Sequence, residues 1–255
     1  MAYPDYIDYY AAAARGLAGH STNKKFGRQT NVSTTSQTIW SGNTAYTYLS
    51  AADNLIIASD ATTDGTAGSG ALTVEVQGVD TDYKYIVNTI TMKGFVAATT
   101  PSQFLRVFRM KVSSSGANDS NNGKICILPD AAGNTFTAVG VPTATSNILA
   151  QIDTATSQTL MTQYTVPATY TAYHYGQVLS ANLPTKTIFV ECYVKPYGEA
   201  WQIKSDWVLT GNTLCDRYTI PYKIDSKSDI EYRCYGSSSA GRVTVNYDML
   251  LCQGD

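Results

Sequence analysis

Two histidines are the side chains of this chain best suited to acid–base chemistry near neutral pH. His20 lies in a polar segment, and His174 lies in a tyrosine-rich run, TYTAYHYGQ. A Ser-His-Asp or Cys-His catalytic group needs a base fixed beside its nucleophile, and no GxSxG motif is present. Paired carboxylates for glycoside hydrolysis cannot be picked out, because most acids flank strands or lie on outward faces. We therefore predict no catalytic residues and no enzyme activity.

Metal-binding chemistry has little support in the sequence. There is no HExxH motif, no CxxC pair and no pair of histidines at ligand spacing, which argues against zinc. Asp80 and Asp82 in GVDTDY could offer oxygens to calcium, but without an EF-hand pattern we prefer a solvated turn. The glycine-rich segment 64–70 lacks GK[ST] and is expected to be a hairpin tip. We expect no metal and no cofactor.

The five cysteines are odd in number, and Cys192 and Cys234 fall at inward positions of apolar strand patterns. A free cysteine at such a position behaves as a small hydrophobic residue. We therefore favour reduced structural thiols over disulfides.

Nineteen tyrosines and three tryptophans permit a sugar-stacking platform. Trp201 and Trp207 share one strand pattern, which is more typical of a core. The tyrosines at 170, 173 and 175 fall partly on opposite faces and do not form one clean row. A carbohydrate-binding adhesin module remains an alternative from a different functional class.

Apolar and polar residues alternate from about residue 201 to residue 251. This alternation indicates the strands that must position the candidate side chains named above. The residues expected to point inward are Val243, Val245, Tyr247, Met249 and Leu251, then Ile230, Tyr232 and Cys234, and finally Trp201, Ile203 and Trp207. A period of two is typical of half-buried strands in antiparallel sheets. The abundance of Thr, Tyr, Ser and Gly fits the same all-β class.

The charge content and the lengths of the apolar stretches argue against nucleic-acid and membrane partners. Charged residues make up 15% of the chain and the net charge is −2. Without a basic run, a nucleic-acid partner bound through phosphate contacts is not expected. No apolar stretch approaches the ~18 residues needed to cross a bilayer, and the acidic start at Met1–Asp8 does not resemble a signal peptide. We expect no membrane partner.

The first 31 residues are predicted to be a short helix followed by an extended arm. Pro4 and Asp5 suit a first helical turn, and Tyr6, Tyr9, Tyr10 and Leu17 follow helical spacing on one apolar stripe. A helix of about 12 residues is marginal alone, so this stripe must be buried on its own domain or on a neighbouring subunit. In the polar segment 20–31, Lys24, Lys25 and Arg28 could contact an acidic partner surface, although a solvated linker is the default.

Two β regions follow this segment. Pro142 to Asp153 is polar and separates blocks of similar length, so we predict domains at 32–145 and 146–255 after an N-terminal segment 1–31. The predicted fold is all-β, with two antiparallel β-sandwich, jelly-roll-like modules preceded by the helix and arm. In the first region Arg106 falls on the inward face, so it needs a carboxylate or carbonyl partner if buried.

Several strand segments resemble structural virion proteins of tailed bacteriophages, particularly marine and cyanobacterial phages. The resemblance lies in NVSTTSQTIWSGNTAYTYLSAADNLIIAS, LTVEVQGVDTDYKYIVNTITMKGFVAATTPSQFLRVFRMKV, QTLMTQYTVPATYTAYHYG, VKPYGEAWQIKSDWVL and RVTVNYDMLL. These segments cover most of the chain beyond the arm. The likeness is spread across strands, so it transfers no functional residues.

The resemblance implies a capsid decoration (cement), head-fibre or tail-accessory role, often as a homotrimer. Low charge and the lack of a catalytic cluster independently favour a protein that works through surface contacts. We expect a capsid decoration protein that bridges capsomers, with the major capsid protein as its main partner. It would be assembled in the host cytoplasm and end in the virion. A tail or head-fibre component is the alternative.

Overall fold

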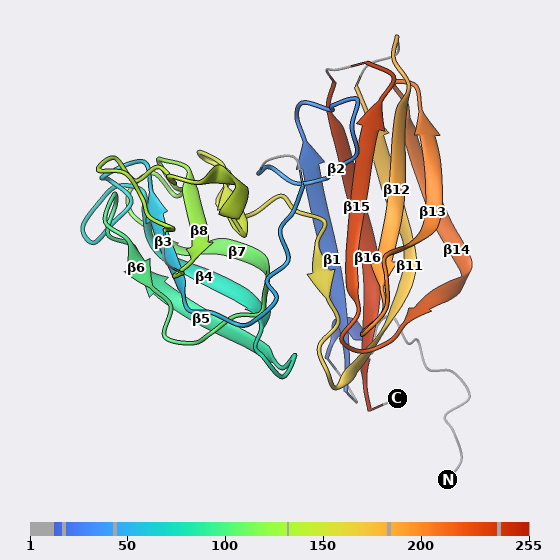
Figure 1. Cartoon of the computed structure of the whole chain (residues 1–255), viewed down its shortest axis with the longest axis horizontal. Helices are drawn as coiled ribbons and strands as arrows, with labels where there is room; N and C mark the ends of the chain where they lie inside the picture. The colour runs from blue at the N-terminus through green and yellow to red at the C-terminus, as the bar shows by residue number, and fades with distance from the viewer. Residues whose placement is uncertain are drawn as a thin grey trace.

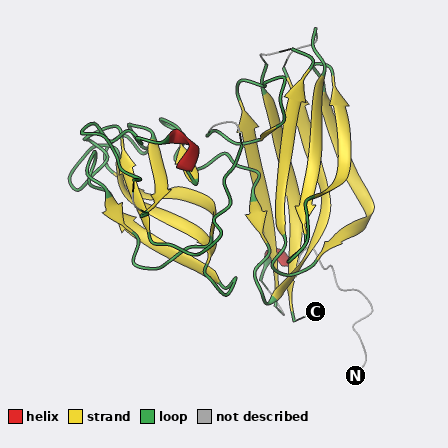
Figure 2. Cartoon of the chain, in the orientation of Figure 1, coloured by secondary structure: helices red, strands yellow, loops and turns green. Residues whose placement is uncertain are grey.

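The computed structural model describes residues 13–16, 19–42, 45–131, 133–182, 185–238 and 241–254. Over these residues the chain is almost entirely β, and its named strands pair in antiparallel fashion (Figure 1, Figure 2). Helical structure there is confined to Ala13 and Ala14 and to a 3-10 turn at Thr145–Asn147. The all-β prediction is confirmed.

Most of the predicted N-terminal helix lies outside the described residues. Tyr6, Tyr9, Tyr10 and Leu17 lie outside the described residues. Ala13 is buried against Leu250 and Cys252, so the chain enters the described part on the outer side of the C-terminal strand.

Eight strands form two sheets that pack face to face around one hydrophobic cluster. The strands are β1 (His20–Gln29), β10 (Tyr164–Thr165), β11 (Tyr170–Ala181), β12 (Ile188–Lys195), β13 (Gln202–Leu209), β14 (Thr213–Ile224), β15 (Asp229–Gly236) and β16 (Val243–Gln253). One sheet has the order β1-β16-β11-β14 and the other β10-β15-β12-β13, with the short β2 (Gln37–Thr38) beside β15. When the eight strands are numbered in chain order, the first sheet has the order 1-8-3-6 and the second sheet has the order 2-7-4-5. This is the arrangement of a double-sheet jelly roll.

The predicted inward faces of the last two strands are buried, but the period of two is not strict, because Glu231 and Leu250 on the opposite faces are buried as well. The expected inward residues of β16 are all buried: Val243, Val245, Tyr247, Met249 and Leu251. Ile230, Tyr232 and Cys234 of β15 are buried as well. Burial of this apolar surface is the main favourable contribution to folding.

β13 departs from the predicted pattern. The sequence predicts Ile203 on the inward face, but its side chain is 54% exposed. The register between β12 and β13 shifts between the pairs Cys192–Ser205 and Tyr193–Ile203, which leaves one extra residue in β13. A bulge of this kind moves the following side chains to the opposite face of the sheet.

The other strands form a second unit, called here the inserted unit, that lies beside the jelly roll (Figure 1). Its strands are β3 (Leu55–Ser59), β4 (Ala71–Val79), β5 (Tyr85–Thr91), β6 (Ala98–Thr99), β7 (Arg106–Ser115), β8 (Ile125–Pro129) and β9 (Ala150–Ile152). They form the sheets β6-β3-β8-β9 and β5-β4-β7 around a separate cluster that includes Phe104 and Ile127.

Strand pairing differs from the predicted succession of a segment 1–31 and domains 32–145 and 146–255. β1 and β2 pair with β16 and β15, and β9 pairs with β8 beyond the expected boundary at 145. The jelly roll is therefore one unit that is interrupted, between its first and second strands, by the inserted unit.

The sequence predicts an extended arm over residues 20–31. This prediction is wrong, because His20–Gln29 forms a ten-residue strand that pairs with β16. Its buried positions are Lys25, Gly27 and Gln29. A strand whose inward residues are polar or glycine carries no apolar alternation, so its pattern resembles a linker.

Gly27 gives a direct test of this strand. A Cβ at this position would lie 2.6 Å from the Ile39 carbonyl oxygen and 2.9 Å from the Thr162 backbone nitrogen. Gly27→Ala should therefore lower the free energy of unfolding by about 1–3 kcal/mol through overpacking. Lys24→Ala, at an exposed position of the same strand, is the control and should change it by less than about 0.5 kcal/mol. Equal urea midpoints for wild type and Gly27→Ala would contradict the placement of β1.

Candidate functional site

A buried ion pair joins the inserted unit to the jelly roll. Arg106 of β7 donates from Nε to Asp229 Oδ1 of β15 at 3.2 Å and from Nη2 to Oδ2 at 3.2 Å. The same guanidinium donates to the carbonyl of Leu49 at 2.7 Å, and Thr165 donates to Asp229 at 2.7 Å. Arg106 is 8% exposed and Asp229 4%. The predicted need of a buried Arg106 for a carboxylate or carbonyl partner is confirmed.

Glu231 forms a second polar contact across the same junction. Its carboxylate accepts hydrogen bonds from the Tyr48 hydroxyl at 3.0 Å and from Arg233 Nε. Burial raises the pKa of Glu231, and the Arg233 guanidinium opposes that rise. The Tyr48 ring packs at 5.2 Å from the ring of Trp201, so the loop before β3 is held against the jelly roll.

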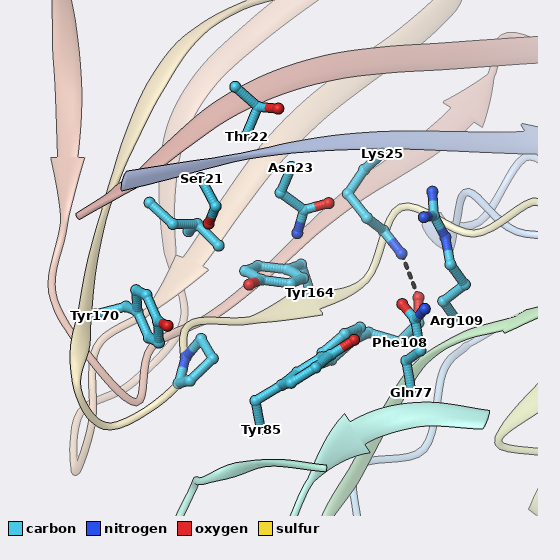
Figure 3. A pocket seen from close by; sticks show the side chains of 12 residues that line it. Ser21, Thr22, Asn23, Lys25, Gln77, Tyr85, Phe108, Arg109, Tyr164 and Tyr170 are labelled. Carbon is cyan, nitrogen blue, oxygen red and sulfur yellow. Dashed lines mark hydrogen bonds between the residues drawn. The ribbon is translucent and has the colours of Figure 1, made fainter. Parts of the chain in front are cut away.

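A cleft of about 370 Å³ lies where β1, β10 and β11 of the jelly roll meet β4, β5 and β7 of the inserted unit (Figure 3). Four aromatic rings line it: those of Tyr85, Phe108, Tyr164 and Tyr170. Phe108 and Tyr164 are buried, whereas Tyr85 is 47% exposed. The Tyr85 and Phe108 rings stack at 6.0 Å, and those of Phe108 and Tyr164 lie 4.7 Å apart.

Basic side chains occupy one end of this cleft. The Lys25 amine donates to the Phe108 carbonyl, as drawn in Figure 3, and lies 5.9 Å from the centre of the Phe108 ring. Burial, with a further contribution from the charge of Arg109, lowers the pKa of Lys25 well below its usual range. Arg109 itself is half-buried and donates to the Lys24 carbonyl at 3.1 Å.

The three basic residues proposed to meet an acidic partner all lie on β1. Lys24 is exposed, Lys25 lines the cleft, and Arg28 lies 3.6 Å from Asp153 in an ion pair. The structure therefore separates them, and their role in partner binding stays a prediction. The sequence does not predict this cleft, because its lining residues lie up to 230 positions apart, from Ser21 to Leu251.

At the opposite side of the jelly roll from the inserted unit, the edge strands β13 and β14 expose apolar side chains (Figure 1). Ile220 is 83% exposed, Val208 55%, Ile203 54% and Tyr222 37%. A groove of about 350 Å³ opens between these strands, and Ile220 and Tyr222 line it. Edge strands with exposed apolar side chains are typical sites of contact with other chains.

His174 lies in the floor of this groove and is buried among tyrosines. Its Nε2 is 3.2 Å from the Tyr232 hydroxyl, which also donates to Gln177 at 3.2 Å. Burial lowers the pKa of His174 to about 4, and burial raises the pKa of the nearby Cys192 thiol to about 12. Burial therefore disfavours both the imidazolium form of His174 and the thiolate form of Cys192.

Asp80, which the sequence offers as a calcium ligand, has a structural role. Asp80 caps its own turn by accepting from the backbone nitrogens of Asp82 and Lys84, both at 2.9 Å. Within the described ranges no group of three or more His, Cys, Asp or Glu side chains could hold a metal ion. The same residues include no helix with the length and apolarity to span a bilayer.

Comparison of the sequence with protein-family models and with curated proteins gives no match. Among solved structures, the VP2 subviral particle of infectious bursal disease virus aligns over 98% of this chain and 78% of its own, at 9% identity and a TM-score of 0.24. The structure of the Gt strain of the same virus aligns over 98% and 83%, at 10% identity and a TM-score of 0.16. The neighbours are viral proteins, but at these scores the similarity is weak and supports no conclusion about site or mechanism.

The Arg106–Asp229 pair can be tested by removing one charge. Asp229→Asn leaves the buried guanidinium without its counter-charge, which should lower the free energy of unfolding by about 3–5 kcal/mol. Asp225→Asn breaks an exposed pair with Lys223 and is the control, with an expected loss below about 1 kcal/mol. Urea denaturation measures both. Similar small losses in the two variants would show that the buried pair does not hold the junction.

His174 predicts a pH dependence of stability. The folded chain keeps this imidazole neutral down to a pKa of about 4, whereas in the unfolded chain it takes up a proton near pH 6.5. Its contribution is therefore complete above about pH 6.5 and is lost as the pH falls toward 4. His174→Phe should show a smaller loss of stability between pH 7 and 4.5 than wild type. Parallel pH profiles of stability for His174→Phe and wild type would contradict this assignment.

Proposed function

We propose that this chain is a structural component of a virion and acts by packing against neighbouring subunits. Its sequence resembles structural virion proteins of tailed phages, and double-sheet jelly rolls are a common architecture of viral capsid domains. That second support is an analogy at the level of fold, so it narrows the class of protein without assigning residues. Within this class we propose a capsid decoration (cement) protein that bridges capsomers as a homotrimer bound to the major capsid protein.

The observation that carries the proposal is the exposed apolar edge formed by β13 and β14. Ile220 is the most exposed of its large hydrophobic side chains, and β14 is the last strand of its sheet. A free strand edge can add a strand from another chain, and apolar side chains beside it would be covered in the same contact. Repeated contacts of this kind strengthen one another in a closed assembly.

The proposed contacts at the start of the chain rest on sequence alone. Tyr6, Tyr9, Tyr10 and Leu17 would anchor the chain on a neighbouring subunit, and the exposed Lys24 of β1 would supply a positive charge. Lys25 and Arg28 are less suited to this role, because one is buried and the other pairs with Asp153.

Ile220→Lys tests the proposed edge. A charge at this position opposes burial of the surrounding apolar surface and should weaken self-association or incorporation into particles by about tenfold or more. Val96→Lys changes a side chain of the inserted unit that is 64% exposed and serves as the matched control. Light scattering after gel filtration gives the oligomeric state, and quantification of the chain in purified particles gives incorporation.

Two results would contradict the proposal. One is normal association and incorporation of the Ile220→Lys chain, provided that its melting temperature matches wild type. The other is an equal loss for the two variants, which would mean that added charge acts without regard to position.

A further inference from the structure

The aromatic cleft at the junction of the two units has the dimensions and lining of a ligand site. Its volume of about 370 Å³ lies within the range of small-molecule pockets, roughly 300–1,000 Å³. Phe108 and Tyr164 form a buried apolar floor, and Tyr85 and Tyr170 stand at its rim (Figure 3). A tyrosine that leaves 47% of its surface in water, beside an apolar floor, offers a ring face to a flat ligand.

Polar side chains converge on the same space. Asn23 from β1 and Gln77 from β4 reach the cleft from opposite units. The Gln77 amide nitrogen is already bonded to Glu75 at 2.6 Å, which leaves its carbonyl oxygen to accept a hydrogen bond. Amides beside aromatic faces match the hydroxyl groups and apolar faces of a sugar ring.

Arg109 supplies a positive charge at one end of the cleft. Arg109 donates to a backbone carbonyl and forms no ion pair within the described part of the chain. The amine of Lys25 lies at the same end (Figure 3). A carboxylate placed there would bond to the Arg109 guanidinium.

We propose that this cleft binds an acidic saccharide, with a sugar ring against Tyr85 and Tyr170 and its carboxylate at Arg109. The site is distinct from the β13–β14 edge and lies on the other side of the jelly roll. It therefore does not depend on the proposed assembly role, and it can be measured on the isolated chain.

Calorimetric titration of the full-length chain tests the site, with galacturonate and mannuronate tetrasaccharides as acidic probes and maltotetraose as the neutral one. Saturable binding is expected for at least one uronate, with weaker binding of maltotetraose. Tyr85→Ala should weaken uronate binding by about three- to tenfold, as expected for loss of one aromatic contact. Arg109→Gln should reduce the preference for the uronate over the neutral sugar.

Tyr235→Ala is the matched control, because Tyr235 also stacks on a phenylalanine, Phe189, at 4.8 Å but lies outside the cleft. It should leave binding unchanged. Tyr85→Phe keeps the ring, so it should retain most of the affinity. A melting temperature of Tyr85→Ala equal to that of wild type shows that its loss of binding is not caused by misfolding. Absence of uronate binding by wild type, or equal affinities of wild type and Tyr85→Ala, would overturn the proposal. Equal binding of maltotetraose and the uronates would overturn its acidic specificity.

Discussion

The Arg106–Asp229 ion pair is the contact on which the arrangement of the two units depends. It connects β7 of the inserted unit with β15 of the jelly roll, and both side chains are buried. A buried charge pair adds little net stability, because desolvation offsets much of the attraction, but it penalises any arrangement that separates the two charges. The planar guanidinium also bonds to the Leu49 carbonyl, which fixes direction as well as distance. The pair therefore favours this orientation of the two units over arrangements that separate its charges.

This orientation gives the molecule two different surfaces. The inserted unit lies beside β1 and β10, where it completes the aromatic cleft. The edge strands β13 and β14 remain uncovered by it and keep Ile220 in solvent. One side thus carries the proposed ligand cleft, and the other carries the proposed subunit contact. A chain with both properties could pack in a shell while still presenting a recognition site.

The sequence predicts the late strands well, because their alternation reflects burial against an apolar core, as Val243 and Tyr247 illustrate. It fails for β1, where Lys25, Gly27 and Gln29 are buried by hydrogen bonds and close packing instead of by hydrophobic side chains. It also fails for Ile203, because a bulge is a feature of pairing that one strand alone does not reveal. The cleft could not be predicted, since it depends on how an insertion between the first two strands folds back on them. The sequence does carry one signal of that junction in Arg106, a charge on an inward face.

A cryo-electron reconstruction of intact virus particles tests the virion assignment most directly. Regular density over the capsid lattice should accommodate the jelly roll and the inserted unit, with β13 and β14 against a neighbouring subunit. Density confined to the tail would place the chain in the alternative tail or fibre class. Absence of the chain from purified particles, or its presence with the β13–β14 edge facing solvent in every copy, would contradict a role based on subunit packing.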